Sequence, residues 1–142
     1  MTDKATFIPD DFRVGFKASH TRTISQADIG LFAGLSGDFS PIHMRQDYAE
    51  KTLFGGRIAH GVISLGLLSA AMAKLPGLVI FISQSVKFPK PVRIGDTITA
   101  TAEVIEIEKD RGIVRLKNTC TNQNGETVVA GQAECRLYQP PR

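Results

Sequence analysis

The sequence predicts an α+β domain in which an antiparallel sheet wraps around one buried helix. Residues 60–74 are apolar almost all round, which is typical of a helix buried on most sides. Residues 78–138 contain several runs that alternate apolar and polar side chains, as strands with one buried face do. With 142 residues, 42% hydrophobic and 22% charged, the chain suits a single domain, 1–142, with one core.

Short elements precede the apolar helix. Ser25-Gln-Ala-Asp28 is a capping sequence, so a helix is expected to begin there, and Gly37 is expected to end it after about Leu35. Ile29, Phe32 and Ala33 would face inward. The other expected segments are an irregular stretch at 1–18, an edge strand at 19–24, a second short helix at 45–51, a loop at 52–57, and a stop to the apolar helix at 76–77.

The second half reads as strands at 78–88, 96–104, 113–121 and 127–138. Ile105 and Ile107 shift the apolar phase, which predicts a bulge near Val104. Asn124-Gly125 predicts a two-residue hairpin turn.

That register sets Cys120 opposite Val129 and Cys135 opposite Val114. The two sulfurs would then lie about 20 Å apart along the ladder, too far for a disulfide. Two free buried thiols are therefore expected, in agreement with a reducing compartment.

Composition excludes several classes of function. The net charge is only +3 and no run of five basic residues exists, so nucleic acid is not an expected partner. The longest apolar stretch, 61–75, includes Ser64, Ser69 and Lys74 and is too short and too polar to cross a membrane. The N-terminus lacks a signal pattern, so a cytoplasmic location is expected. Two cysteines and three histidines match no zinc spacing, so no metal is expected.

The segment 32–43 carries the main chemical signal. Asp38 and His43 lie five positions apart, and Gly37 and Pro41 bracket a turn between them. A carboxylate and a neutral imidazole that share one water are what proton transfer at neutral pH needs. The alternative is structural: Asp38 caps a short helix at Ser40-Pro41, and His43 is a satisfied, half-buried histidine.

Ser36-Gly37-Asp38-Phe39-Ser40-Pro41-Ile42-His43, with Ala59-His60-Gly61 downstream, resembles the hydratase motif of the MaoC-like proteins, most nearly the short (R)-specific enoyl-CoA hydratases. The resemblance extends from about Phe16 to Leu137 and includes the segment from Phe88 to Asp96. It implies a hot-dog fold, a long central helix swaddled by an antiparallel sheet, in a homodimer with the sheets joined edge to edge.

The resemblance also implies roles for single residues. Asp38 and His43 would be the catalytic pair, Gly61 would give its backbone N–H to the thioester oxygen, and Ser69 would lie by the acyl pocket. The family usually has asparagine where this chain has Ser40, which leaves the loop geometry and the rate open. From the residues alone, Gly61 also reads as a plain helix start, and Ser69 as a packing serine bonded to a carbonyl four residues back.

The implied reaction is the addition of water to a trans-2-enoyl-CoA, with coenzyme A as part of the substrate and no cofactor. Lys87, Lys90 and Arg93 cluster among prolines, where such charges usually form a solvated face but could meet the phosphates of coenzyme A. Two alternatives stay open: a 3-hydroxyacyl-acyl-carrier-protein dehydratase, and a non-catalytic acyl-thioester binder or dimerising scaffold. A hot-dog thioesterase fits less well, because its hydrolytic carboxylate does not suit an Asp-x-x-Pro-x-His loop.

Overall fold

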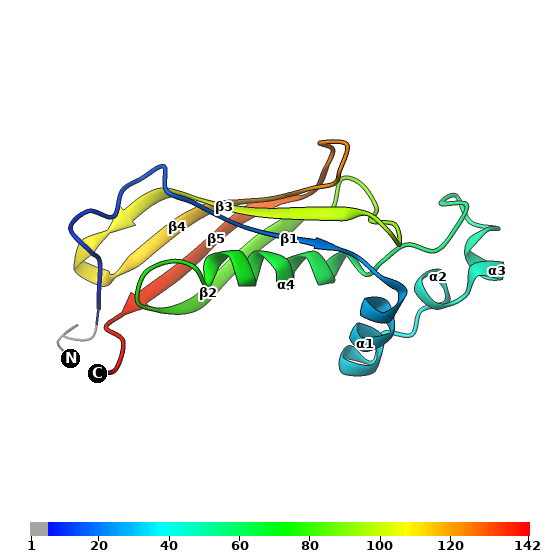
Figure 1. Cartoon of the computed structure of the whole chain (residues 1–142), viewed down its shortest axis with the longest axis horizontal. Helices are drawn as coiled ribbons and strands as arrows, with labels where there is room; N and C mark the ends of the chain where they lie inside the picture. The colour runs from blue at the N-terminus through cyan, green and yellow to red at the C-terminus, as the bar shows by residue number, and fades with distance from the viewer. Residues whose placement is uncertain (1–5) are drawn as a thin grey trace.

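Five antiparallel strands form one sheet that wraps around helix α4, as the sequence predicted (Figure 1). The computed structural model describes residues 6–142. The strand order is β1-β3-β4-β5-β2, so β1 and β2 are the two edges. The elements are β1 (Lys17–Thr23), α1 (Gln26–Ser36), α2 (Pro41–Met44), α3 (Gln46–Ala49), α4 (Gly61–Met72), β2 (Leu78–Lys87), β3 (Thr97–Glu108), a 3₁₀ turn (Lys109–Arg111), β4 (Ile113–Thr121) and β5 (Thr127–Tyr138).

The core lies between α4 and the inner face of the sheet. Leu68 and Ala71 of α4 are fully buried, as are the alternate residues of β3 from Ile98 to Val104. The prediction that α4 is buried on most sides is confirmed except along one stripe of the helix, where Val62 is 51% exposed and Gly66 and Ser69 are also exposed. A single sheet covers only one side of a helix, so the side of α4 away from the strands stays open.

The hairpin between β4 and β5 has the predicted register but not the predicted turn. Cys120 pairs with Val129 and Cys135 with Val114, and both thiols are buried and free as expected. The turn is wider than two residues, because the Asn122 side chain accepts hydrogen bonds from the backbone N–H groups of residues 124 and 126, both at 3.0 Å. The register shifts by one residue between Cys120, which pairs with Val129, and Thr121, which pairs with Thr127. Val128 is therefore left without a partner in the ladder, and Val128 and Val129 are both buried.

The predicted bulge in β3 is confirmed by a register shift between Val104 and Glu106. The predicted start of α1 is also confirmed, because Ser25 and Asp28 form a capping box. Arg22 hydrogen-bonds both Asp28 carboxylate oxygens and, with the Ser25 N–H, lowers the pKa of Asp28 to about 2.

The segment between α1 and α4 differs in detail from the prediction. One short helix was expected at 45–51, but two single-turn helices form instead, separated by Arg45 in extended conformation. Pro41 begins the first of them, as a proline at the first helical position can. Gly37 ends α1 in the left-handed region, with φ 83°, as predicted. Helices α1–α3 lie together beyond one end of the sheet (Figure 1).

No helix among residues 6–142 is long and apolar enough to cross a membrane.

Candidate active site

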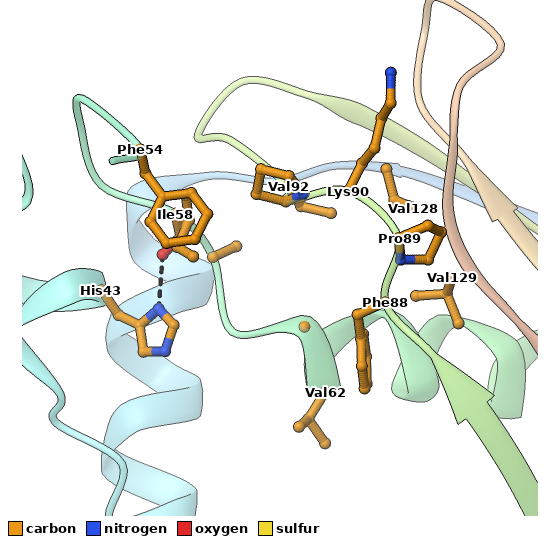
Figure 2. Close-up of a pocket in the computed structure, with 13 residues that line it drawn as sticks. His43, Phe54, Ile58, Val62, Phe88, Pro89, Lys90, Val92, Val128 and Val129 are labelled. Atoms are coloured by element: carbon orange, nitrogen blue, oxygen red, sulfur yellow. Dashed lines mark hydrogen bonds between the residues drawn. The ribbon is translucent and has the colours of Figure 1, made fainter. Parts of the chain in front are cut away.

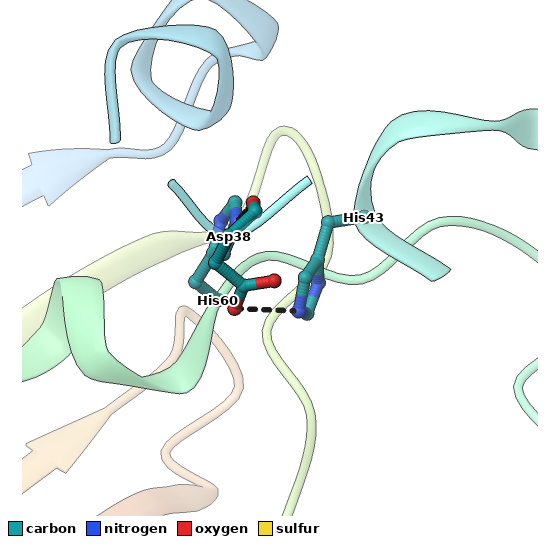
Figure 3. Close-up of side chains that lie close together, drawn as sticks. All are labelled: Asp38, His43 and His60. Carbon is teal, nitrogen blue, oxygen red and sulfur yellow. Dashed lines mark hydrogen bonds and ion pairs between the residues drawn. The ribbon is translucent and has the colours of Figure 1, made fainter. Parts of the chain in front are cut away.

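Asp38 and His43, the pair singled out in the sequence, lie close together beside the N-terminus of α4 (Figure 3). The His43 Nε2 atom is 3.9 Å from Asp38 Oδ2, too far for a direct hydrogen bond and close enough for one oxygen atom to contact both. Asp38 lies in the loop after α1, where its Oδ1 accepts the Ser40 backbone N–H at 3.1 Å. Asp38 therefore does not cap α2 itself but bonds Ser40, the residue that does. The structural alternative, in which Asp38 caps this helix, is met only to that extent.

A hydrogen bond on the side of the ring away from Asp38 sets the orientation of His43. Its Nδ1 lies 2.8 Å from the Ile58 carbonyl oxygen, the bond drawn in Figure 2. A carbonyl can only accept, so Nδ1 carries the hydrogen and Nε2 presents a lone pair on the Asp38 side. The imidazole side chain is 13% exposed and the carboxylate is 49% exposed. The pair can thus accept a proton from a water without first breaking a bond between its members.

An apolar pocket of about 360 Å³ opens beside His43 (Figure 2). Three stretches of chain line it: 54–62, 88–92 and 128–129. Phe54, Phe88, Val128 and Val129 were not predicted as site residues. For the two valines, the register shift in the hairpin is what turns both side chains inward. The pocket is suited to an apolar chain with a polar group at one end.

Gly61, the first residue of α4, belongs to the pocket wall. The N–H groups of a first helical turn have no partner within the helix and favour negative charge. A Cβ at this position would lie 2.8 Å from Phe88 Cδ1, so the ring packs where any side chain would be. The structure therefore places the predicted oxyanion donor on the same pocket as His43.

The other predicted site residues are spread more widely. Ser40 is half-buried and caps α2 without a side-chain hydrogen bond. Ser69 is exposed on the open side of α4 and does not line the pocket of His43. Its place by the acyl chain stays a prediction.

The three predicted phosphate contacts do not form one cluster. Lys90 is on the pocket rim, where its ammonium pairs with Glu126 and lowers the pKa of that carboxyl. Arg93 Nη1 donates to the Gly56 carbonyl at 3.4 Å. Lys87 lines a separate shallow depression over β2, β4 and β5.

His60, part of the motif that carries the resemblance but without a predicted role, lies beside this pair. It is 2% exposed, and its ring centroid is 4.0 Å from that of His43, with the planes inclined by 31°. Ligating atoms of Asp38, His43 and His60 all lie within 4.8 Å of one another. Each ring already bonds a backbone carbonyl oxygen through one nitrogen, His43 through Nδ1 and His60 through Nε2.

Comparison with known proteins agrees with this site. Residues 12–127 match the MaoC like domain. The chain belongs to the MaoC-like family. The structure of an (R)-hydratase from Aeromonas caviae superposes on this MaoC-like chain with a TM-score of 0.86 at 34% identity, covering 91% of this chain and 99% of that one. The hot-dog fold that the resemblance implied is thereby confirmed.

Two curated relatives of this MaoC-like protein are similar over most of their length. An (R)-specific enoyl-CoA hydratase of Rhodospirillum rubrum is 47% identical over 126 residues, 87% of each chain. A 3-hydroxybutyryl-CoA dehydratase of Methylorubrum extorquens is 40% identical over 126 residues, 87% of this chain and 80% of the relative.

Proposed function

We propose that this protein is an (R)-specific enoyl-CoA hydratase, which adds water to one face of a trans-2-enoyl-CoA and yields (R)-3-hydroxyacyl-CoA. The observation that carries the proposal is the 3.9 Å gap between Asp38 Oδ2 and His43 Nε2, beside an apolar pocket that Gly61 also lines. The names of the two curated relatives, a hydratase and a dehydratase of CoA thioesters, agree with it.

In this reaction one water molecule lies between the two side chains. As its oxygen bonds to C3 of the alkene, one proton of the water passes to the pair, and the pair delivers a proton to C2. Both parts therefore reach the same face. The negative charge that develops on the thioester oxygen is met by the Gly61 N–H at the start of α4.

The substrate brings its own coenzyme A, and no cofactor or metal is part of the proposal. Lys90 and Arg93, near the pocket, are the proposed contacts for its phosphates, with Lys87 the more remote candidate. Since Lys90 is paired with Glu126, a phosphate would have to compete with that carboxylate. Added salt should raise the KM for a CoA substrate if these contacts form.

A homodimer is part of the proposal. Edge strand β2 carries Ile80, Phe81 and Ile82 with 41–51% of their surfaces exposed, and the open side of α4 adds Val62. An unpaired apolar edge of this kind invites pairing with a second copy. A cytoplasmic location is proposed from the two free buried thiols, which suit a reducing compartment.

The test is loss of the enoyl absorbance of crotonyl-CoA after the purified protein is added. Asp38→Asn and His43→Ala should each lower kcat by at least about 100-fold, because each removes one partner of the proton transfers. The matched controls Asp110→Asn and His20→Ala change the same residue types away from the pocket and should leave kcat unchanged. Normal turnover in both pair variants would remove the assignment.

Two other outcomes would redirect the proposal. Activity on a carrier-protein-bound 3-hydroxyacyl substrate, with little on the CoA form, would favour the dehydratase alternative. Binding of crotonyl-CoA without turnover by the wild-type protein would favour a non-catalytic binder.

A further inference from the structure

His60 is a buried polar residue that the proposed reaction does not use. It directly precedes α4 and makes no capping hydrogen bond with its side chain. Its ring contacts those of Phe32 and His43, at centroid distances of 4.7 Å and 4.0 Å. Its Nε2 atom is 2.9 Å from the backbone carbonyl oxygen of Asp38. One side chain therefore touches both members of the pair (Figure 3).

The hydrogen bond to Asp38 defines the state of the His60 ring. Because the carbonyl oxygen can only accept, Nε2 must carry the hydrogen, and Nδ1 is left with a lone pair. That Nδ1 atom is buried and has no hydrogen-bond partner within residues 6–142. A buried acceptor without a partner lowers stability, so a residue needed only to fill this space would be better as phenylalanine. The Nε2–H group, which donates to the Asp38 carbonyl, is the feature that phenylalanine could not provide at this position.

The bond from His60 also ties two separate parts of the site together. Asp38 lies in the irregular loop between α1 and α2, and its backbone N–H donates to a local partner, Ser36 Oγ, at 3.1 Å. The His60 bond links that loop to the start of α4. Two residues earlier, the carbonyl of Ile58 holds His43. Residues 58–61 thus bond the ring of His43 and the backbone of Asp38, and they include Gly61 itself.

We propose that His60 is a positioning residue. Its Nε2–H group holds the loop of Asp38 at a fixed place relative to Gly61, and its ring packs against the ring of His43. This inference rests on the proposed hydratase function. Its consequence is that loss of the N–H displaces the carboxylate from the water without changing the pocket that binds the acyl chain. A shift of about 1 Å in such a group can cost about 100-fold in rate.

Two substitutions separate the N–H from the ring. His60→Phe keeps an aromatic ring of similar size and removes the donor, and His60→Gln keeps an amide N–H near the position of Nε2. We expect His60→Phe to lower kcat for crotonyl-CoA by about 10- to 100-fold, with KM within about three-fold. His60→Gln should recover most of that loss. The matched controls His20→Phe and His20→Gln, on β1, should leave kcat unchanged.

Equal losses of kcat in the two His60 variants, or wild-type kcat in a folded His60→Phe, would overturn the proposal. A wild-type protein without activity would reject the hydratase function but not the positioning role, so a second readout is needed. Nitrogen-15 NMR of the histidine rings provides it, because only three histidines must be assigned. We expect His60 protonated at Nε2, and His43 resonances that move in His60→Phe more than in His60→Gln. A His60 ring protonated at Nδ1 would overturn the proposal, even if His60→Phe does not fold.

Discussion

Replacing Gly61 with alanine tests the proposed oxyanion position without removing any functional group. The added Cβ would lie 2.8 Å and 2.9 Å from two ring atoms of Phe88, where ordinary contact between carbon atoms is about 3.5–4.0 Å. The ring must therefore retreat by about 1 Å. Phe88 is 47% exposed and lines the pocket, so it can move, but only by reshaping the wall that faces the substrate.

The two consequences of Gly61→Ala differ in size. Crowding in a core costs about 1–3 kcal/mol, but a half-exposed ring gives way more easily. Alanine also has less conformational freedom than glycine in the unfolded chain, which stabilises the folded state by about 0.4–1 kcal/mol. The free energy of unfolding should therefore change by less than about 1 kcal/mol. In contrast, a displacement of about 1 Å between the thioester oxygen and its donor should lower kcat/KM for crotonyl-CoA by about 100-fold.

Gly30→Ala is the matched control. Gly30 lies inside α1, and a Cβ there would meet no atom within 4 Å. This variant should gain about 0.5–1 kcal/mol in the free energy of unfolding and keep the wild-type kcat/KM. Urea titration and the enoyl absorbance assay on both variants give the comparison. A Gly61→Ala protein with wild-type kcat/KM would refute the placement of the thioester oxygen at this helix start.

Three further outcomes are expected. The pKa of Asp28 is lower in the folded protein than in the unfolded chain, so the stabilisation that its carboxylate gives is complete above about pH 4 and is lost as the pH falls toward 2. Asp28→Asn should therefore lower the free energy of unfolding by about 1 kcal/mol at pH 7 and by almost nothing at pH 2. An equal cost at both pH values would contradict this. Burial raises the pKa of Cys120 to about 12 and that of Cys135 to about 11, so a thiol reagent at pH 8 should label neither until the protein unfolds. Ser40 bonds Asp38 through its backbone N–H, so Ser40→Ala should change kcat by less than about three-fold, and a large loss would show that the hydroxyl acts.

Local chemistry explains how much of the fold could be predicted. The capping box at Ser25 and Asp28, the end of α1 at Gly37, the bulge after Val104 and the pairing of Cys120 with Val129 all depend on residues close in sequence or on strict alternation. The two-residue turn was wrong because a single side chain, that of Asn122, widened it.

The sequence alone determined the α+β class, the family resemblance and the identity of the pair at 38 and 43, because periodicity and a short motif are both legible within a few residues of chain. Only the tertiary structure decided that His60 touches both members of that pair, that Ser69 lies on the open side of α4, and that 54–62, 88–92 and 128–129 form one pocket. These facts depend on packing between segments far apart in the chain. No local pattern encodes such contacts, since each stretch meets its partners only when the sheet closes around the helix.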